Sequence, residues 1–185
     1  MIYLMRHGED LKGYVGGWSS VPLTEKGKKK VLKNAKWIKR NLNIKRIITS
    51  DVNRAVESAE IVKNVLGIEY EKCELLREQN KGTLTGKASD SLTEYEKNLL
   101  DFQEIDTIFP NGESLINLHD RIKNNLSFFS SLEDNTLLIT HRGVINSFYY
   151  IFNNIDLDMN KKQFKVKYAS IHEADFKLST IKRIK

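Results

Sequence analysis

Short apolar runs alternate with longer amphipathic segments along most of this 185-residue chain. The runs at 2–6, 46–50 and 136–140 have the length and the β-branched content of buried strands. The longer segments repeat apolar residues every three or four positions, as helices with one buried face do. Strands that alternate with helices predict an α/β fold, a three-layer sandwich with a mainly parallel central sheet and helices on both faces.

Capping residues bound several of the expected helices. Thr24 is a good N-cap for a helix that extends to about residue 42, and Gly67 is a typical stop for a helix over 53–66. A weak helix near 92–102 would bury Tyr95 and Phe102 as core. The other expected elements are a strand over 70–76, a long helix over 114–132, a helix over 144–152 and two strands within 164–184.

The size of the chain predicts one domain over residues 1–185. At this length folding buries roughly 70% of the surface of the extended chain, so the hydrophobic residues can fill a sizeable core. Residues 79–113 are the least regular part, with Gly82, Gly86 and a Pro-Asn-Gly-Glu turn. We expect this stretch to form a lid-like insertion in the domain.

Composition disfavours several classes of protein. A single cysteine, Cys73, excludes a disulfide scaffold, and the four histidines have no zinc-site spacing with it. No apolar run approaches the ~18 residues of a membrane helix, and charge enters the N-terminal sequence too soon for a secretion signal. We therefore expect a cytoplasmic protein that holds no metal and has no membrane partner.

The net charge of +6 is confined to the C-terminal tail. Residues 1–160 hold 22 basic and 22 acidic side chains, whereas residues 161–185 hold 8 basic and 2 acidic ones. Such a tail could bind nucleic acid. The basic residues of the tail alternate with apolar ones, however, as they do along a half-buried edge strand with one solvent-exposed face. Lysine on such a strand commonly prevents aggregation through the sheet edge. We expect this second role and no nucleic-acid partner; the tail lysines are Lys161, Lys162, Lys165, Lys167, Lys177, Lys182 and Lys185.

Three predicted strands deliver histidine or arginine at their carboxyl ends. The first ends in Arg6-His7-Gly8, the strand over 136–140 is followed by His141-Arg142-Gly143, and the second is followed by Arg54 in the next helix. Ligands of open α/β sheets bind at these ends, so the two histidines should meet although more than a hundred positions separate them. An arginine guanidinium can donate two parallel hydrogen bonds to phosphate oxygens. This group of cations therefore predicts a site for a phosphate dianion.

These residues resemble the histidine phosphatase superfamily, which includes cofactor-dependent phosphoglycerate mutases and small phosphatases. The resemblance covers nearly the whole chain, because six segments occur in the family's order. They are Arg6-His7-Gly8-Glu9; Gly17-Trp18-Ser19-Ser20-Val21-Pro22-Leu23-Thr24; Ser50-Asp51 with Arg54, Ala55 and Ala59; Leu76-Arg77-Glu78 with Gly82 and Gly86; Pro110-Asn111-Gly112-Glu113-Ser114; and Thr140-His141-Arg142-Gly143-Val144. The short length and the opening loop are similar to the α-ribazole phosphatase branch.

The resemblance implies a role for each matching residue. His7 would attack phosphorus and become a phosphohistidine, and Glu78 would first protonate the leaving oxygen and then activate water. Nearby cations keep an imidazole unprotonated, as a nucleophile requires, and a carboxyl close to phosphate retains its proton more readily. No metal or other cofactor is implied. The residues implied to hold the phosphoryl group or other parts of the substrate are Arg6, Arg54, His141, Gly17 and Arg142.

Three positions depart from the family pattern. Gly13 stands where several members carry an Asn that contacts phosphate, and Asp10 stands where Ser or Thr is frequent. Because a carboxylate would repel phosphate, we expect Asp10 to point away from the site. Arg142 replaces a commoner Gly, and two roles stay open for it: a cation of the pocket, or a solvated residue at the start of a helix.

The expected activity is metal-independent hydrolysis of a phosphate monoester through a phosphohistidine, on a small phosphorylated metabolite. Phosphoglycerate mutase-type transfer is the alternative, but Lys81 stands where mutases carry Tyr, and Ser89 where they carry Lys. A phosphate-binding module without catalysis is a third possibility. The sequence selects neither the substrate nor the oligomeric state.

Overall fold

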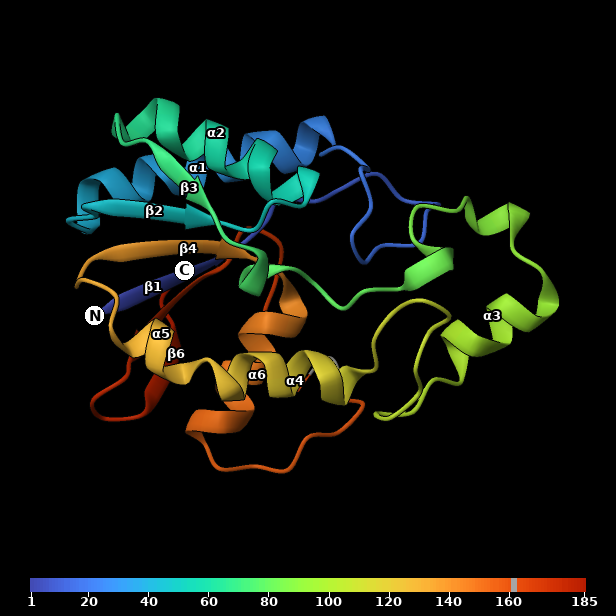
Figure 1. The fold of residues 1–185 in the computed structure, drawn as a ribbon. Helices are drawn as coiled ribbons and strands as arrows, with labels where there is room; N and C mark the ends of the chain where they lie inside the picture. The colour runs from blue at the N-terminus through green and yellow to red at the C-terminus, as the bar shows by residue number, and fades with distance from the viewer. Residues whose placement is uncertain (161–162) are drawn as a thin grey trace.

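A six-stranded mixed sheet forms the centre of the molecule (Figure 1). The computed structural model describes residues 1–160 and 163–185, so two of the tail lysines, Lys161 and Lys162, lie outside the described residues. Four neighbouring strands, β3-β2-β4-β1, are parallel, and β5 and β6 continue the sheet in antiparallel pairing. The strands are β1 (Ile2–Arg6), β2 (Arg46–Thr49), β3 (Tyr70–Lys72), β4 (Thr136–Thr140), β5 (Ile171–Asp175) and β6 (Thr180–Arg183).

Helices cover both faces of the sheet (Figure 1), as the alternating pattern predicts. One face carries α1 (Glu25–Asn41) and α2 (Asn53–Leu66). The other carries α4 (Leu115–Asn124), α5 (Leu126–Ser130) and α6 (Arg142–Phe152), while α3 (Glu94–Asp101) lies in a segment that projects beyond the sheet. The predicted three-layer α/β fold is confirmed.

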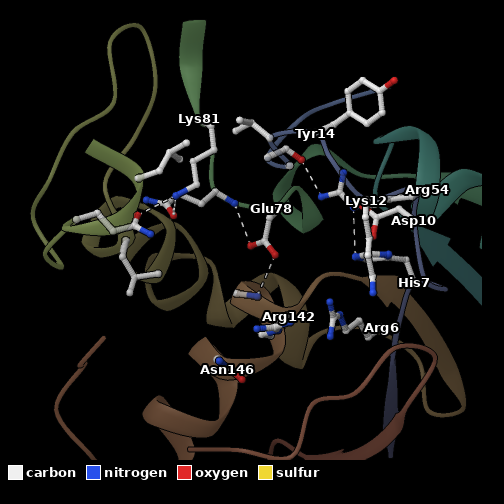
Figure 2. A pocket seen from close by; sticks show the side chains of 18 of the residues that line it. Arg6, His7, Asp10, Lys12, Tyr14, Arg54, Glu78, Lys81, Arg142 and Asn146 are labelled. Carbon is white, nitrogen blue, oxygen red and sulfur yellow. Dashed lines mark hydrogen bonds and ion pairs between the residues drawn. The ribbon is translucent and has the colours of Figure 1, made fainter. Parts of the chain in front are cut away.

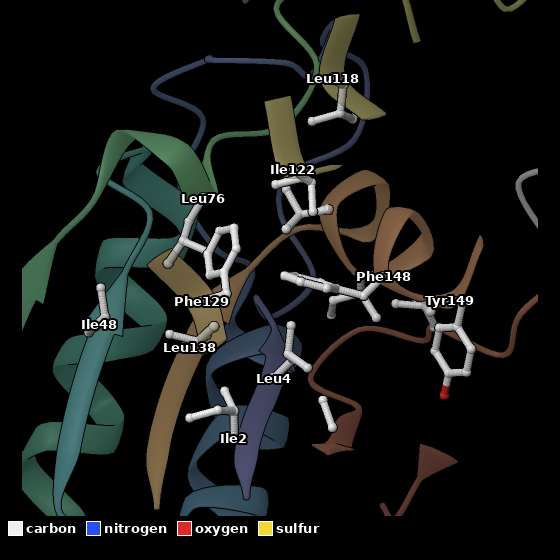
Figure 3. Close-up of a cluster of buried hydrophobic side chains, with 14 residues drawn as sticks. Ile2, Leu4, Ile48, Leu76, Leu118, Ile122, Phe129, Leu138, Phe148 and Tyr149 are labelled. Carbon is white, nitrogen blue, oxygen red and sulfur yellow. The ribbon is translucent and has the colours of Figure 1, made fainter. Parts of the chain in front are cut away.

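Alternating side chains of the central strands fill two separate cores. In β1, Ile2 and Leu4 pack toward α4–α6, whereas Tyr3 and Met5 pack toward α1 and α2. Figure 3 shows the first core, in which Phe129 and Phe148 cover these strands. Burial on both faces explains why the central strands are almost entirely apolar in sequence. The polar residues that interrupt this pattern therefore mark strand ends.

Local capping fixes the ends of the first two helices as predicted. The Thr24 hydroxyl accepts a hydrogen bond from the Gly27 amide at 2.9 Å, which satisfies one free donor at the start of α1. Gly67 ends α2 in the left-handed region, with φ of 74°. These two helices need no tertiary information to be located.

Two expected elements are shorter than the sequence suggested. The strand expected over 70–76 ends at Lys72, because its partner β2 ends at Thr49, and the chain then turns through a 3₁₀ helix at Glu74–Leu76. The helix expected over 114–132 breaks at Asn125, whose side-chain amide donates to the Arg121 carbonyl and competes with the helical backbone.

The tail departs further from expectation. Its strands β5 and β6 form the antiparallel edge of the sheet, but the segment between Phe164 and Ser170 is not extended in any strand. Lys165 and Lys167 therefore do not lie on an edge strand, although Lys182 in β6 does. The irregular segment instead crosses the carboxyl end of β1, because the Arg6 amide donates to the Ser170 carbonyl at 3.1 Å.

The stretch over 79–113 contributes Leu84, Leu92 and Phe109 to a small apolar cluster that also includes Val15. The prediction that α3 buries its aromatic residues is wrong, since Tyr95 is 70% exposed and Phe102 is 77% exposed. This eight-residue helix contributes Leu99 and Leu100 to the cluster, which leaves its aromatic residues on the outer side.

Across residues 1–160 and 163–185, no helix combines the length and apolar composition that crossing a bilayer requires.

Candidate active site

A cavity of about 700 Å³ opens at the carboxyl ends of β1 and β4 (Figure 2). Parallel pairing brings these ends together, because Arg6 is in register with Thr140 and the His7 amide donates to the Thr140 carbonyl at 2.9 Å. The cavity wall includes six of the seven predicted site residues: Arg6, His7, Gly17, Arg54, Glu78 and Arg142. The seventh, His141, is fully buried and contacts the His7 ring.

His7 is almost completely buried and presents one ring nitrogen as a base. Its Nδ1 lies 2.7 Å from the Gly8 carbonyl oxygen, which can only accept, so Nδ1 carries the proton. The other nitrogen, Nε2, accepts a hydrogen bond from Nε of Arg54 at 3.2 Å. Burial, followed by the charges of Arg54 and Arg6, holds the pKa of His7 well below its usual value. The ring is therefore neutral at pH 7, with the lone pair on Nε2.

Arg54 is held rigidly beside this lone pair. Its guanidinium is 2% exposed and donates to the Gly17 carbonyl at 2.8 Å and to the Ser19 hydroxyl at 3.3 Å. Gly17 thus contributes to the site by orienting Arg54 through its backbone, where its φ of 70° favours glycine. Burial lowers the pKa of Arg54, and the guanidinium remains a cation at neutral pH.

Arg6 lies on the other side of His7 and is only partly satisfied. Its guanidinium stacks 3.8 Å above the centre of the Tyr168 ring, and Nη1 donates to the Val166 carbonyl at 3.1 Å. Burial and the nearby Arg142 lower the pKa of Arg6 to about 10, so it too is charged at pH 7. Its buried Nε has no hydrogen-bond partner among the residues that the structure describes.

His141 completes the cage from the end of β4. Its ring centre lies 5.0 Å from that of His7, which confirms that the two histidines meet. Its Nε2 lies 2.9 Å from the Ser50 hydroxyl, while its buried Nδ1 has no partner within the described chain. Buried nitrogens without partners are rare in folded proteins. Here His141 and Arg6 both provide one next to His7, as a binding site for an oxyanion requires.

Glu78 is fixed by two backbone amides. Its Oε1 accepts from the Gln79 amide at 3.0 Å, and its Oε2 accepts from the Gly143 amide at 3.2 Å, in the first turn of α6. A Cβ on Gly143 would lie 2.2 Å from Oε1 of Glu78, so only glycine leaves room for the carboxylate here. Figure 2 shows the carboxylate facing the cavity between Lys81 and Arg142.

The loop that carries Glu78 is held from two sides by residues that sequence reasoning did not identify. Trp18 donates from its indole to the Glu78 carbonyl at 2.7 Å. Arg121, on α4, donates to the Leu75 carbonyl at 2.6 Å and to the Arg77 carbonyl at 3.1 Å. No local motif marks these two bonds of Arg121, because the carbonyls that accept them are more than 40 positions away in sequence.

Asp10 and Arg142, two positions that depart from the family pattern, both lie in the cavity wall. The expectation that Asp10 points away is wrong: it lines the cavity, and its Oδ2 lies 3.6 Å from Nε of Arg54. The opposite charge of Arg54 explains why a carboxylate lies at an anion site. Arg142 also lines the cavity (Figure 2) and, among the described residues, makes no hydrogen bond or ion pair.

Comparison with known proteins identifies the family to which this α/β fold, with its group of buried cations, belongs. Residues 2–182 match the model of the histidine phosphatase superfamily (branch 1). The chain belongs to this superfamily, whose members catalyse phosphoryl transfer. Over the part of the chain that the structure describes, no group of three or more His, Cys, Asp or Glu side chains is arranged to hold a metal ion.

Individual relatives differ in the activity that their names state. The probable phosphoglycerate mutase GpmB of Escherichia coli O1:K1 is 36% identical over 148 residues, which span 76% of this chain and 68% of the relative. The structure of Bacillus stearothermophilus YhfR aligns with a TM-score of 0.81 at 26% identity, over 99% of this chain and 94% of the other. A putative alpha-ribazole-5'-P phosphatase from Escherichia coli K-12 has a TM-score of 0.80 at 19% identity, over 98% and 93%, and shares the fold.

Proposed function

We propose that this protein hydrolyses phosphate monoesters of small metabolites through a phosphohistidine on His7. The observation that carries the proposal is the unprotonated Nε2 of His7, held among the buried cations Arg6 and Arg54 and the His141 ring. Covalent catalysis of this kind divides one difficult displacement into two easier ones. Positioned cations then supply most of what phosphoryl transfer needs from a protein.

In the first step, the Nε2 lone pair of His7 forms a bond to phosphorus while the bond from phosphorus to the leaving oxygen breaks. Glu78 donates a proton to that oxygen, so the product alcohol leaves uncharged and Glu78 becomes a carboxylate. Negative charge spreads over the three remaining phosphoryl oxygens. The unpartnered Nε of Arg6 and Nδ1 of His141 supply hydrogen-bond donors for these oxygens.

In the second step, water replaces the alcohol. The Glu78 carboxylate takes a proton from the water as its oxygen bonds to phosphorus, and the bond between phosphorus and Nε2 breaks. Inorganic phosphate is released, His7 returns to its neutral form and Glu78 is again protonated. The hydrogen bond from Nδ1 to the Gly8 carbonyl keeps the ring in one orientation through both steps.

The direct test is hydrolysis of p-nitrophenyl phosphate in excess EDTA. Phosphate release should be unaffected by the chelator and abolished by His7→Ala. Quenched wild-type enzyme should contain a phosphoryl group that acid releases and alkali does not, as expected of a phosphorus–nitrogen bond. The matched control is His119→Ala, because His119 is a half-buried histidine that does not line the cavity. Activity that survives His7→Ala would disprove the mechanism.

A mutase activity is the second candidate, because the relative GpmB is named a probable phosphoglycerate mutase. Both reactions share the phosphohistidine and differ in whether water or a second hydroxyl accepts the phosphoryl group. Incubation with 3-phosphoglycerate separates them: we expect inorganic phosphate to accumulate faster than 2-phosphoglycerate. The reverse result would assign a mutase, whereas tight phosphate binding without turnover of any ester would indicate a binding module.

A further inference from the structure

One side chain of the cavity wall is buried, polar and unsatisfied without having any part in the phosphoryl chemistry. Asn146 is 7% exposed and lines the cavity. Its Oδ1 is buried with no hydrogen-bond partner, and no described residue bonds to its Nδ2 either. A buried amide usually has its hydrogen bonds satisfied, and leaving one unmet destabilises the fold. Such a group therefore points to a partner that arrives from outside.

The position of Asn146 on α6 places its amide on the same side of the helix as Arg142, toward the cavity. Asn146 follows Arg142 by four residues, one helical turn, so both side chains lie on the same face of the helix. Figure 2 shows Asn146 beyond Arg142 at the cavity wall, further from His7 than the arginine. Arg142 lies close enough to Arg6 to lower its pKa and thus borders the phosphate cage. Asn146 consequently faces the part of the cavity that receives the leaving group.

The chemistry of the amide limits what it can recognise. Rotation about the terminal torsion of an Asn side chain is easy, so either its carbonyl or its NH₂ group can face the ligand. A hydroxyl group, which both donates and accepts, is able to pair with it in either orientation. The cavity as a whole is partly apolar, with Leu11, Val15, Leu100 and Leu115 in its wall. An alkyl or aryl leaving group would leave the amide buried and unpaired.

We propose that Asn146 selects the leaving group by hydrogen bonding to a hydroxyl on it, so that the substrates are phosphate monoesters of polyols or sugars rather than of plain alcohols. This inference rests on the proposed hydrolase function. A site built to bond a substrate hydroxyl discriminates against the analogue that lacks it, because the protein group is then buried without a partner. The discrimination expected from one neutral hydrogen bond is about tenfold or more.

The test compares matched ester pairs that differ only in hydroxyl groups. Glycerol 1-phosphate is paired with n-propyl phosphate, and ribitol 5-phosphate with n-pentyl phosphate, so that two distances from the phosphate are covered. For each pair the ratio of kcat/KM is measured in the wild type and in Asn146→Leu, whose side chain has the same number and branching of heavy atoms and no polar atom. We expect Asn146→Leu to lower the ratio about tenfold or more in at least one pair. Asn98→Leu, on the exposed surface of α3, makes the same chemical change outside the cavity and should leave both ratios unchanged.

Stability gives a readout that does not depend on turnover. Because the amide is unpaired in the free protein, Asn146→Leu should unfold at the same temperature as the wild type or about 2 to 4 °C above it. A clear fall in the unfolding temperature of both Asn146→Leu and Asn146→Ala would mean that the amide has a structural partner and would overturn the inference. If the leucine variant fails to fold, Asn146→Ala is used for the ratios.

The outcomes separate this inference from the function on which it rests. Ratios that are unchanged by Asn146→Leu in both pairs, with p-nitrophenyl phosphate still hydrolysed by the wild type, refute the role of Asn146 and leave the hydrolase intact. No hydrolysis of any ester by the wild type refutes the proposed function itself. A selective loss for the hydroxylated esters supports the inference.

Discussion

Replacing Arg121 by methionine tests how the loop that carries Glu78 is stabilised. The guanidinium is 18% exposed and makes three good hydrogen bonds: to the Leu75 and Arg77 carbonyls and, at 2.9 Å, to the Glu113 carboxylate. A bond to a charged partner contributes about 1.5 kcal/mol and a bond to a carbonyl somewhat less, so the variant should lose about 3 kcal/mol of unfolding free energy. For a chain of this length that corresponds to a fall of roughly 6 to 12 °C in Tm.

A surface ion pair on the same protein is the control. Arg46 also donates two hydrogen bonds to a carboxylate, that of Glu71, but its side chain is 37% exposed and that of Glu71 is 62% exposed. Exposed pairs contribute less than about 1 kcal/mol, so Arg46→Met should lower Tm by only a few degrees. Urea and thermal unfolding measure both variants. If Arg121→Met costs no more stability than Arg46→Met, the loop is not held as the geometry indicates.

Three further predictions concern the acid, the pH dependence and the anion site. Gly143→Ala should displace the Glu78 carboxylate and reduce kcat more for alkyl phosphates, whose leaving groups need a proton, than for p-nitrophenyl phosphate; an equal loss on both would contradict the assignment of Glu78. Burial, together with the charge of Arg183, lowers the pKa of His172 to about 4. The unfolded chain therefore binds a proton at this histidine more readily than the folded chain does, and the free energy of unfolding declines as the pH falls from 6.5 toward 4. Between pH 7 and pH 5 this decline should be about 2 kcal/mol smaller in His172→Gln than in the wild type, measured by urea unfolding at each pH, and an unchanged slope would exclude the effect. Asp10→Asn removes a negative charge from the cavity and should strengthen inhibition by inorganic phosphate roughly fivefold; weaker inhibition would show that the carboxylate matters chiefly for orienting Arg54.

The sequence alone was sufficient for the regular elements with strong local signals. Thr24 begins α1 and Gly67 ends α2 through a hydrogen bond and a backbone angle that involve only nearby residues. The apolar runs of β1 and β4 are explained by burial on both faces of a sheet. Elements that depend on a partner were less predictable, since β3 ends where β2 ends and the segment after Phe164 is shaped by contacts at the end of β1.

The candidate site shows the same division. Sequence reasoning brought His7 and His141 together because parallel strands deliver their carboxyl ends to one edge of a sheet, and their ring centres are 5.0 Å apart. It placed Asp10 wrongly, because it considered only the repulsion between the Asp10 carboxylate and phosphate. The attraction between that carboxylate and the Arg54 guanidinium was left out. Two residues that hold the loop of Glu78 in place, Trp18 and Arg121, were not identified as supports from the sequence.

The order of residues along this chain therefore determined the α/β class, the helix ends and the edge of the sheet where the histidines and arginines gather. Those features follow from side-chain periodicity, capping and strand polarity, which are local or topological. Only the tertiary structure decided which ring nitrogen of His7 carries the lone pair, how Glu78 is held and that Asn146 lies unsatisfied in the cavity wall. These depend on hydrogen-bond distances of about 3 Å, both between neighbours such as His7 and Gly8 and between residues far apart in sequence such as Glu78 and Gly143, and periodicity does not specify such distances.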